Sequence, residues 1–526
     1  MTITNPILPG FHPDPSICRA GDTYYIATST FEWYPGVEIN ASENLEDWRL
    51  VARPLERAAQ LDMRGEPDSC GVWAPSLSYA DGLFWLIYTD MKRYDGNYKD
   101  SHNYLVTSPS IEGPWSDGIR LNSSGFDPSL FHDADGRKWF VNMDWDYRGV
   151  QGGRGDGFFS GIVMQEYDPV AKSLVGPITR IFEGTERGVT EAPHLYQRDG
   201  WYYLITAEGG TGYDHAVTHA RSRKIEGPYE LHPMVHPLIA SKSKDAPLQR
   251  IGHGQFIEDD DGAVWHTFLC GRPLPGTQRS PLGRESGITQ MEWRDDGWLY
   301  PLEMPAVAVD GFAEDHQETR FEDGLPLAFQ WLRSPEKDRL FSTTAQPGAL
   351  RLFGRESIGS WFEQSLVARR QTGWRYSAET LLEFDPVDYQ TQAGLVAYYN
   401  RHQFHYLFVS RNNAGARVLG IQTCPGVWPE GWVDLPLGDG VIIADGPIRL
   451  GVDVDLEKLQ FWYALDGGDK QTIGPMLDAS ILSDEAGRGE HACFTGAFVG
   501  MAAQDVSGRA HPADFGFFSY RNRQNA

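Results

Sequence analysis

The stretch Phe11-His12-Pro13-Asp14-Pro15-Ser16 decides the fold, because related stretches return along the first three hundred residues. The later copies are Val72-Trp73-Ala74-Pro75-Ser76, Phe126-Asp127-Pro128-Ser129, Glu191-Ala192-Pro193-His194 and His253-Gly254-Gln255-Phe256. Each copy is followed by a turn and an aromatic-rich run, and the turn residues Asp22, Asp81, Asp135, Asp199 and Asp261 lie 54 to 64 residues apart. Regular self-similarity of this kind is the signature of a repeat architecture. Five copies of one unit therefore make up this part of the chain.

The units consist of short strands joined by turns. Tyr24-Tyr25-Ile26-Ala27-Thr28 is rich in aromatic and β-branched residues, and Val37-Glu38-Ile39-Asn40 alternates apolar with polar residues. No helical pattern separates such runs, and strand-only units of about 40–60 residues favour a β-propeller over a β-sandwich. The sequence therefore predicts a five-bladed β-propeller over residues 1–311. The opening motif of each unit is expected on the innermost strand, at one mouth of the central channel.

The repeat is lost after Met304-Pro305. Residues 312–340 are predicted to be a polar, Glu-rich linker. Residues 341–526 hold strand after strand without the earlier period, which predicts a β-sandwich of the jelly-roll, concanavalin-like kind. The whole chain is thus expected to be all-β. The sandwich is expected to pack on the propeller, with a carbohydrate-binding module as the alternative.

Composition limits the classes of partner. The 526 residues carry a formal charge of −26, with 41% hydrophobic and 13% aromatic residues. An acidic, aromatic-rich chain is typical of an ordered globular protein and argues against nucleic-acid binding, which needs clustered Lys and Arg. No apolar run approaches the roughly 18 residues of a membrane span. The residues after Met1 show no signal-peptide pattern, and the five cysteines form no C-x-x-C pair, so a cytoplasmic protein is expected.

The differences between the repeats indicate a site. Where two units have Asp14 and Asp127, two others have Ala74 and Ala192 and the last has Gly254, while Glu191 stands one residue earlier in the fourth unit only. A requirement of the fold should be met similarly in every blade, so carboxylates in three of five equivalent places favour a functional cluster over solvated turn acids. The carboxylates of the Asp-Gly turns are interpreted as turn chemistry.

Three carboxylates around one channel suit the cleavage of a glycosidic bond, which needs one protonated and one ionised carboxyl. Nearby aromatic residues would offer faces for stacking on sugar rings: Phe31, Trp33, Trp73 and Trp145. Metal-assisted hydrolysis is the weaker interpretation, because a single histidine, His253, shares the motif position. Mg²⁺ or Ca²⁺ could bind there, but no zinc pattern exists.

The motifs in order resemble glycoside hydrolase family 43, and most closely its two-domain β-xylosidases. The resemblance is carried by Asn5-Pro6-Ile7-Leu8-Pro9-Gly10 running into Phe11–Ser16, by Gly71–Ser76, by Thr190–Tyr196, and by Leu282-Gly283-Arg284-Glu285. It covers essentially the whole chain. It implies a five-bladed propeller followed by a β-sandwich, and hydrolysis with inversion at the anomeric carbon.

The resemblance also implies roles for residues. Asp14 would be the general base that deprotonates water, Glu191 the general acid, and Asp127 the third acid, which orients the sugar and raises the pKa of Glu191. Arg284 would hold xylose hydroxyls, with a blade-edge salt bridge as its alternative. Phe31, Trp73 and Trp145 would wall the pocket, or belong to the core. His253 would face a hydrated Ca²⁺ in the channel, or be a core histidine.

A sandwich loop would close the pocket in such relatives. Cys493-Phe494-Thr495-Gly496-Ala497-Phe498 matches that loop, and Phe494 is preferred over Phe498 as the closing residue. A pocket closed at one end admits a terminal sugar only. The expected function is therefore an inverting exo-β-1,4-xylosidase acting on xylo-oligosaccharides, with a second activity on α-L-arabinofuranosides. The resemblance also implies a homo-oligomer, either a dimer or a tetramer.

Two other functions stay open at this point. Fructan- and sucrose-cleaving enzymes also join a five-bladed propeller to a sandwich, but they carry N-D-P-N-G, R-D-P and E-C motifs, whereas Asp14 is followed here by Pro-Ser and Glu191 by Ala. A non-catalytic lectin or scaffold propeller is the third candidate. It would need no buried acids of unequal pKa.

Overall fold

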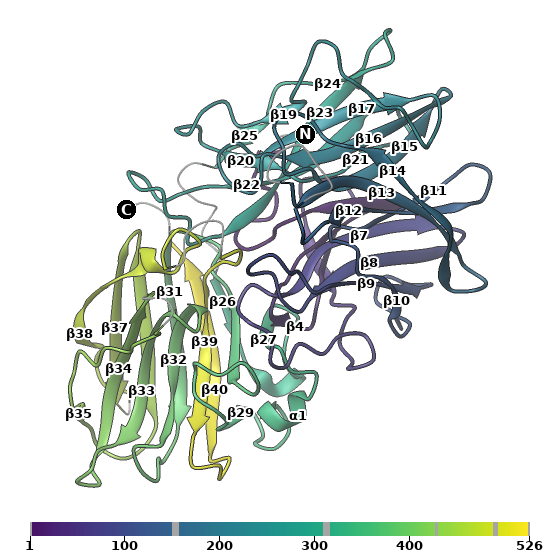
Figure 1. Ribbon diagram of the computed structural model, residues 1–526. Coiled ribbons are helices and arrows are strands. Elements are labelled where there is room, and N and C mark those ends of the chain that lie inside the picture. Colours follow the sequence, from purple (N-terminus) through teal and green to yellow (C-terminus); the bar gives the residue numbers. More distant parts are fainter. Residues whose placement is uncertain are drawn as a thin grey trace.

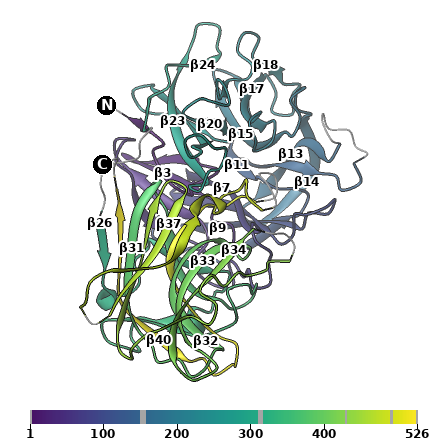
Figure 2. The ribbon, with the colours of Figure 1, turned by 90° about the vertical axis from the view of Figure 1, so that its left-hand side faces the viewer.

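The structure is a computed structural model of the chain and describes residues 3–149, 157–308, 316–426, 430–465, 467–487 and 493–523. These residues form two all-β parts, a fan of small sheets and a pair of long sheets (Figure 1). The same two parts are seen from the side in Figure 2. A five-bladed β-propeller followed by a β-sandwich, as expected from the repeats, is confirmed. The boundary expected at residues 311–312 lies outside the described residues.

Each repeat folds into one antiparallel sheet, a blade whose strands follow each other outward. The first blade contains β2 (Ser16–Ala20), β3 (Thr23–Thr28), β5 (Glu38–Ser42) and β6 (Arg49–Ala52). The second contains β7 (Gly71–Ala80), β8 (Leu83–Met91), β9 (Ser101–Ser108) and β10 (Ile119–Asn122). The third contains β11 (Ser129–His132), β12 (Lys138–Trp145), β13 (Phe159–Asp168) and β14 (Ser173–Phe182).

The last two blades carry one extra strand each. The fourth contains β15 (Glu191–Arg198), β16 (Trp201–Glu208), β17 (Ala216–Ser222), β18 (Glu230–Leu231) and β19 (Ile239–Ala240). The fifth contains β20 (Gln249–Gly252), β21 (Phe256–Glu258), β22 (Val264–Gly271), β23 (Arg284–Trp293) and β24 (Leu299–Pro301).

The amino-terminal segment fastens the ring of blades. β1 (Thr4–Asn5) pairs in parallel with β25 (Ala306–Val307). The Asn5 side chain donates to the Ile288 carbonyl and accepts from the Ile288 N–H, at 2.9 and 2.8 Å. Asn5 thereby ties the start of the chain to β23 of the fifth blade, so the ring is closed by contacts between its two ends.

The second part is a sandwich of two sheets. One has the order β28 (Phe341–Ser342), β29 (Leu350–Phe353), β40 (Pro512–Asn522), β31 (Arg375–Glu383), β36 (Ile448–Asp455), β37 (Lys458–Leu465) and β38 (Gln471–Asp478), and β26 (His316–Thr319) also pairs with β40. The other has the order β35 (Val441–Ile442), β34 (Arg417–Pro425), β33 (Gln403–Arg411), β32 (Thr391–Asn400), β39 (Phe498–Asp505), β30 (Ser365–Arg370), β27 (Phe329–Leu332) and β4 (Trp33–Tyr34). The short helices are η1 (Phe321–Asp323), α1 (Lys337–Leu340) and η2 (Ala479–Ile481).

The stretch 312–340, expected to be a linker, differs from that expectation. Its described part contains β26 and β27, which hydrogen-bond to β40 and β30 of the two sandwich sheets. The strand Phe329–Leu332 is buried at all four positions. β26 and β27 have only four residues each, which is too short for an alternating pattern to be read from the sequence, and here the tertiary partners supply the pairing.

The two parts share a sheet and a core. β4 leaves the first blade and pairs with β27, with Trp33 opposite Leu332 and Tyr34 opposite Trp331. One cluster of buried apolar side chains runs from the first two blades into the sandwich. The sandwich is therefore packed against the propeller.

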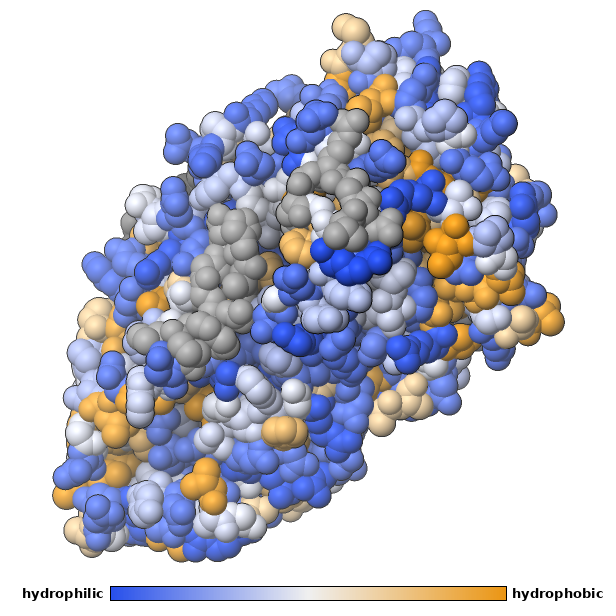
Figure 3. Space-filling model, in the orientation of Figure 1, coloured by the Kyte–Doolittle hydropathy of each residue, from blue (hydrophilic) through white to orange (hydrophobic). Residues whose placement is uncertain are grey.

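Polar side chains dominate the face of the molecule seen in Figure 3, in keeping with the formal charge of −26. Within the described residues, the helices are all too short to cross a membrane.

Candidate active site

A cavity of about 550 Å³ lies where the propeller meets the sandwich. Nine of the residues that were singled out in the sequence line it: Asp14, Phe31, Trp73, Asp127, Trp145, Glu191, His253, Arg284 and Phe494. Trp33, also expected to offer a face to a sugar, does not line it, because this side chain is fully buried in the apolar core. The nine residues come from all five blades and from the loop before β39. This volume falls in the usual range of small-molecule sites, about 300–1,000 Å³.

A repeated backbone bend carries these side chains to the cavity. Asp14, Ala74, Asp127, Ala192 and His253 all have a left-handed backbone, with φ of 57°, 40°, 53°, 52° and 34°. Such a conformation costs a non-glycine residue about 1–3 kcal/mol, and it persists only where the surroundings enforce it. The bend is a requirement of the fold because all five blades keep it. The side chain at the bend is free to differ between blades.

The register of the fifth repeat differs from the one expected. His253, not Gly254, has the left-handed φ, and Gly254 does not share it. The sequence misplaced the motif because Gly-Gln stands where three other units have the Pro-Ser pair that marks the position. His253 is therefore the fifth-blade counterpart of Asp14.

Asp14 is held by three neighbours. Ser29 Oγ donates to Asp14 Oδ2 at 2.6 Å. Arg284 Nη1 and His253 Nδ1 each lie 3.6 Å from Asp14 Oδ1. His253 Nδ1 is also 3.9 Å from Asp127 Oδ2, so two of the three carboxylates face one imidazole.

Burial controls the protonation of the other two acids. Burial raises the pKa of Glu191 to about 8, with a further contribution from the Asp14 charge, while Arg284 and Lys99 oppose the rise. The pKa of Asp127 is raised well above its ordinary value, by burial first and then by Glu191 and Asp14. Two carboxyls with raised pKa values beside Asp14 provide a proton donor and a hydrogen-bond donor at neutral pH.

Glu191 and Asp127 influence each other's ionisation. After burial, the Glu191 charge contributes to the raised pKa of Asp127. The expected effect of Asp127 on the pKa of Glu191 stays a prediction.

His253 is buried beneath the acids, and burial lowers its pKa, although Asp14 opposes the shift. The narrow space on its channel side is lined by side chains such as Ser16, Ser76 and His194. Among the described residues, no three His, Cys, Asp or Glu side chains are grouped as a metal ion requires. Direct coordination of Ca²⁺, which takes six to eight oxygens, therefore does not fit these residues. A hydrated ion facing His253 stays a prediction.

Arg284 and Phe494 join the propeller to the sandwich at the cavity wall. Arg284 Nη2 donates to the Phe494 carbonyl at 2.8 Å, and its guanidinium lies 5.4 Å from the Phe31 and Phe494 ring centroids. Arg284 Nε is buried without a hydrogen-bond partner among the described residues.

Phe494 lines the cavity, whereas Phe498 does not. The Phe494 ring is stacked near Phe31, with centroids 6.3 Å apart, and meets Trp73 edge-on at 5.7 Å. Phe498 is fully buried and stacks on Trp33 at 3.7 Å. Phe494 thus stands at the pocket end, and Phe498 belongs to the core between the domains.

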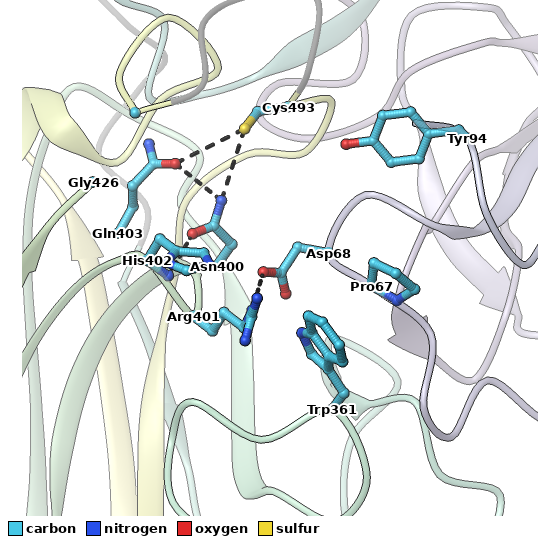
Figure 4. A pocket seen from close by; sticks show the side chains of 11 residues that line it. Pro67, Asp68, Tyr94, Trp361, Asn400, Arg401, His402, Gln403, Gly426 and Cys493 are labelled. Carbon is cyan, nitrogen blue, oxygen red and sulfur yellow. Dashed lines mark hydrogen bonds and ion pairs between the residues drawn. The ribbon is translucent and has the colours of Figure 1, made fainter. Parts of the chain in front are cut away.

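The loop that carries Phe494 is anchored on both domains. The Phe494 N–H donates to Ser69 Oγ at 3.1 Å, and the Thr495 N–H donates to the Tyr399 hydroxyl at 3.1 Å. Behind the loop, the Cys493 side chain points toward Gln403 and Asn400 of the sandwich, and Tyr94 of the second blade approaches from the other side (Figure 4). Figure 4 also shows the ion pair of Arg401 with Asp68, 3.2 Å, which crosses the same junction.

Four residues of the site had no signal in the sequence. Ser29 holds Asp14 and also accepts from the Ala74 N–H at 2.8 Å. Ser69 accepts from Phe494, and its carbonyl accepts from Trp73 Nε1 at 2.9 Å. Lys99 and Tyr94 line the cavity.

Comparison with known proteins agrees with this architecture. Residues 3–299 match the model of glycosyl hydrolases family 43, and residues 319–521 match the β-xylosidase C-terminal concanavalin A-like domain. Xylosidase/arabinosidase 43B of Humicola insolens is 54% identical over 99% of this chain and 98% of its own. The β-xylosidase of Bacillus subtilis (strain 168) is 46% identical over 99% and 100%.

Solved structures give the same result. The crystal structure of xylan β-1,4-xylosidase from Bacillus halodurans C-125 superposes with a TM-score of 0.93 at 46% identity, covering 99% of this chain and 100% of the other. Both domains are thus matched in sequence and in shape. The chain belongs to glycoside hydrolase family 43.

Proposed function

We propose that this glycoside hydrolase is an inverting, exo-acting enzyme that removes terminal xylose from β-1,4-xylo-oligosaccharides, with a second activity on α-L-arabinofuranosides. The observation that carries the proposal is the set of three buried carboxyls from three blades around one cavity, of which Glu191 and Asp127 have raised pKa values. The xylosidase and arabinosidase names of the relatives support the substrate class.

In the proposed reaction, Asp14 is the general base and Glu191 the general acid. Asp14 takes a proton from water, whose oxygen attacks the anomeric carbon of the terminal sugar. Glu191 gives its proton to the glycosidic oxygen as the bond from that oxygen to the anomeric carbon breaks. Both acids exchange protons with solvent before the next turnover. The neutral carboxyl of Asp127 orients the sugar by donating a hydrogen bond.

The pocket end supports exo action. Phe31, Phe494 and Arg284 pack on one another there, and Phe31 and Arg284 are buried. A sugar seated against them has no room for a further residue beyond its non-reducing end. Arg284 lines the cavity, and its guanidinium is proposed to hold one of the hydroxyls of this sugar.

The test separates the two acids by leaving group. Glu191→Ala should lower kcat on xylobiose by about 10²–10⁴-fold and spare nitrophenyl-xyloside, because nitrophenolate leaves without protonation. Asp14→Ala should lower kcat on both substrates, because water must be activated in either case. Equal residual activity of the two variants on both substrates would contradict the assignment.

The anomeric outcome is a second measurement. We expect proton NMR of the first turnovers on xylobiose to show α-xylose, the inverted product. Initial release of β-xylose would instead indicate a retaining enzyme, as in the fructan-cleaving alternative.

Two further expectations stay predictions. A hydrated Ca²⁺ facing His253 would make activity sensitive to a chelator, and a homo-oligomer, either dimer or tetramer, would show in light scattering. No step of the reaction is assigned to either.

A further inference from the structure

Two loops that contact each other form the rim of the cavity. One follows β8 and carries Asp95, Gly96 and Lys99, and the other follows β12 and begins at Trp145. Trp145 Nε1 donates to the Asn97 carbonyl at 2.8 Å, and Lys99 Nζ lies 4.4 Å from the Trp145 ring centroid. The two loops therefore form one wall, in which Trp145 is the aromatic face toward the cavity.

Two solvent-exposed tyrosines belong to these loops. Tyr98 lies between Asn97 and Lys99, and Tyr147 lies two residues after Trp145. Their rings stack with centroids 4.7 Å apart and planes 19° from parallel, yet the residues are 55% and 45% exposed. Neither belongs to a buried apolar cluster of the described residues. Hence the pair is not explained by packing of the core.

The pair lies beside the exposed part of the cavity lining. Phe31 and Arg284 line the cavity and are buried, whereas Asp95 and Gly96, which precede Tyr98 in the chain, line the cavity and are exposed. A chain whose terminal sugar is held at the acids should leave toward the exposed lining. Trp145 lines the cavity and is bonded to Asn97, and the other exposed aromatic faces on the described part of these loops are those of Tyr98 and Tyr147.

We propose that the stacked pair Tyr98–Tyr147 is a binding platform for the third sugar of a xylo-oligosaccharide, beyond the two residues joined by the scissile bond. The inference rests on the proposed function and extends it to longer substrates. A pyranose ring presents a face of C–H groups, and tyrosine offers a rigid apolar face with a polar hydroxyl at its edge. Because the two rings already stack on each other in the free protein, little further side-chain entropy is lost when a sugar binds.

The experiment compares substrates of two lengths. Tyr98→Ala and Tyr147→Ala should each lower kcat/KM for xylotriose by about threefold to tenfold, mostly through KM, because one stacking contact is lost. The same variants should keep kcat/KM for xylobiose within about twofold, because xylobiose does not reach the platform. Retained activity on xylobiose also shows that the variants are folded.

Matched variants sharpen the comparison. Tyr98→Phe and Tyr147→Phe keep the ring faces and should keep the preference for xylotriose. Tyr389→Ala removes a tyrosine of similar exposure, 62%, from the sandwich and should change neither substrate. Equal losses on both substrates, or an unchanged value for xylotriose, would overturn the platform. A wild-type protein that cleaves neither oligosaccharide would instead overturn the proposed function.

Discussion

At the scale of single residues, Glu191 lies where burial and the neighbouring Asp14 charge both favour a protonated carboxyl. Lys99 acts in the opposite direction, because its positive charge favours the ionised form. The side chain of Lys99 is held at the rim beside Trp145 and donates to the Tyr94 carbonyl at 2.7 Å. The balance between these charges decides up to which pH Glu191 can deliver a proton.

The pH profile of the enzyme should report this balance. A general acid works in its protonated form, so kcat on xylobiose should fall as the pH rises through about 8, the raised pKa of Glu191. Lys99→Met removes the charge that lowers this pKa, and the alkaline limb should then move to higher pH. Lys99→Arg keeps the charge and should leave the limb in place. A limb that moves to lower pH in Lys99→Met would show that Glu191 does not control it.

At the scale of elements, the connection between β22 and β23 carries the contact between the propeller and the Phe494 loop. Gly283, just before Arg284, has φ of 68°, and a Cβ there would lie 2.3 Å from the Thr495 carbonyl oxygen. Gly276, in the same connection, has φ of 77° but open space around it. The two glycines share the backbone conformation and differ only in the close approach of the sandwich loop.

Alanine at these positions should therefore act differently. Gly276→Ala should cost about 1–2 kcal/mol of unfolding free energy, the strain of a left-handed residue. Gly283→Ala bears the same strain and also pushes the loop of Phe494 away, so it should lower Tm further and raise KM for xylobiose. Thermal melting and initial rates measure both effects. Equal Tm and KM in the two variants would mean that the loop tolerates displacement.

The same elements show what the sequence could reveal. The repeats predicted the blades because each copy has its own turn and strand pattern, and Asp14, Asp127 and Glu191 were found because they break that repetition. Ser29 and Ser69 were not found, because their roles arise from contacts between blades and domains, which leave no local pattern. The strands β26 and β27 were missed for a similar reason: their pairing partners lie far away in the chain.

At the scale of the whole molecule, a buried cluster of charges joins the two domains close to the general base. Arg370, on β30 of the sandwich, donates through Nε to the Phe11 carbonyl at 2.6 Å and pairs through Nη1 with Glu38 Oε2 at 2.5 Å. Glu38 also pairs with Arg53 at 2.6 Å and with His12 at 2.7 Å. The pKa of Glu38 is lowered well below its ordinary value, because Arg370, Arg53 and His12 together overcome the effect of burial.

Breaking this cluster should affect stability and rate together. Arg370→Met leaves Glu38 buried with one cation fewer, which typically costs about 3–5 kcal/mol. It also frees the Phe11 carbonyl, three residues before Asp14, so kcat should fall as well. Arg375→Met removes an exposed pair with Asp455 from the same domain and should cost less than about 1 kcal/mol with kcat unchanged.

Chemical denaturation and initial rates on xylobiose test this comparison, and calorimetry adds a further criterion. Because β4 of the propeller is a strand of the sandwich sheet and one apolar core spans both parts, the wild-type protein should unfold in a single transition. Arg370→Met removes one of the links between the domains. Calorimetry of this variant should therefore show two separate melting transitions, one for each domain, while each domain by itself keeps its stability. If Arg370→Met and Arg375→Met lost the same stability and kept the same kcat, the sandwich would be a passive neighbour of Asp14, and its contribution to the site would be confined to Phe494.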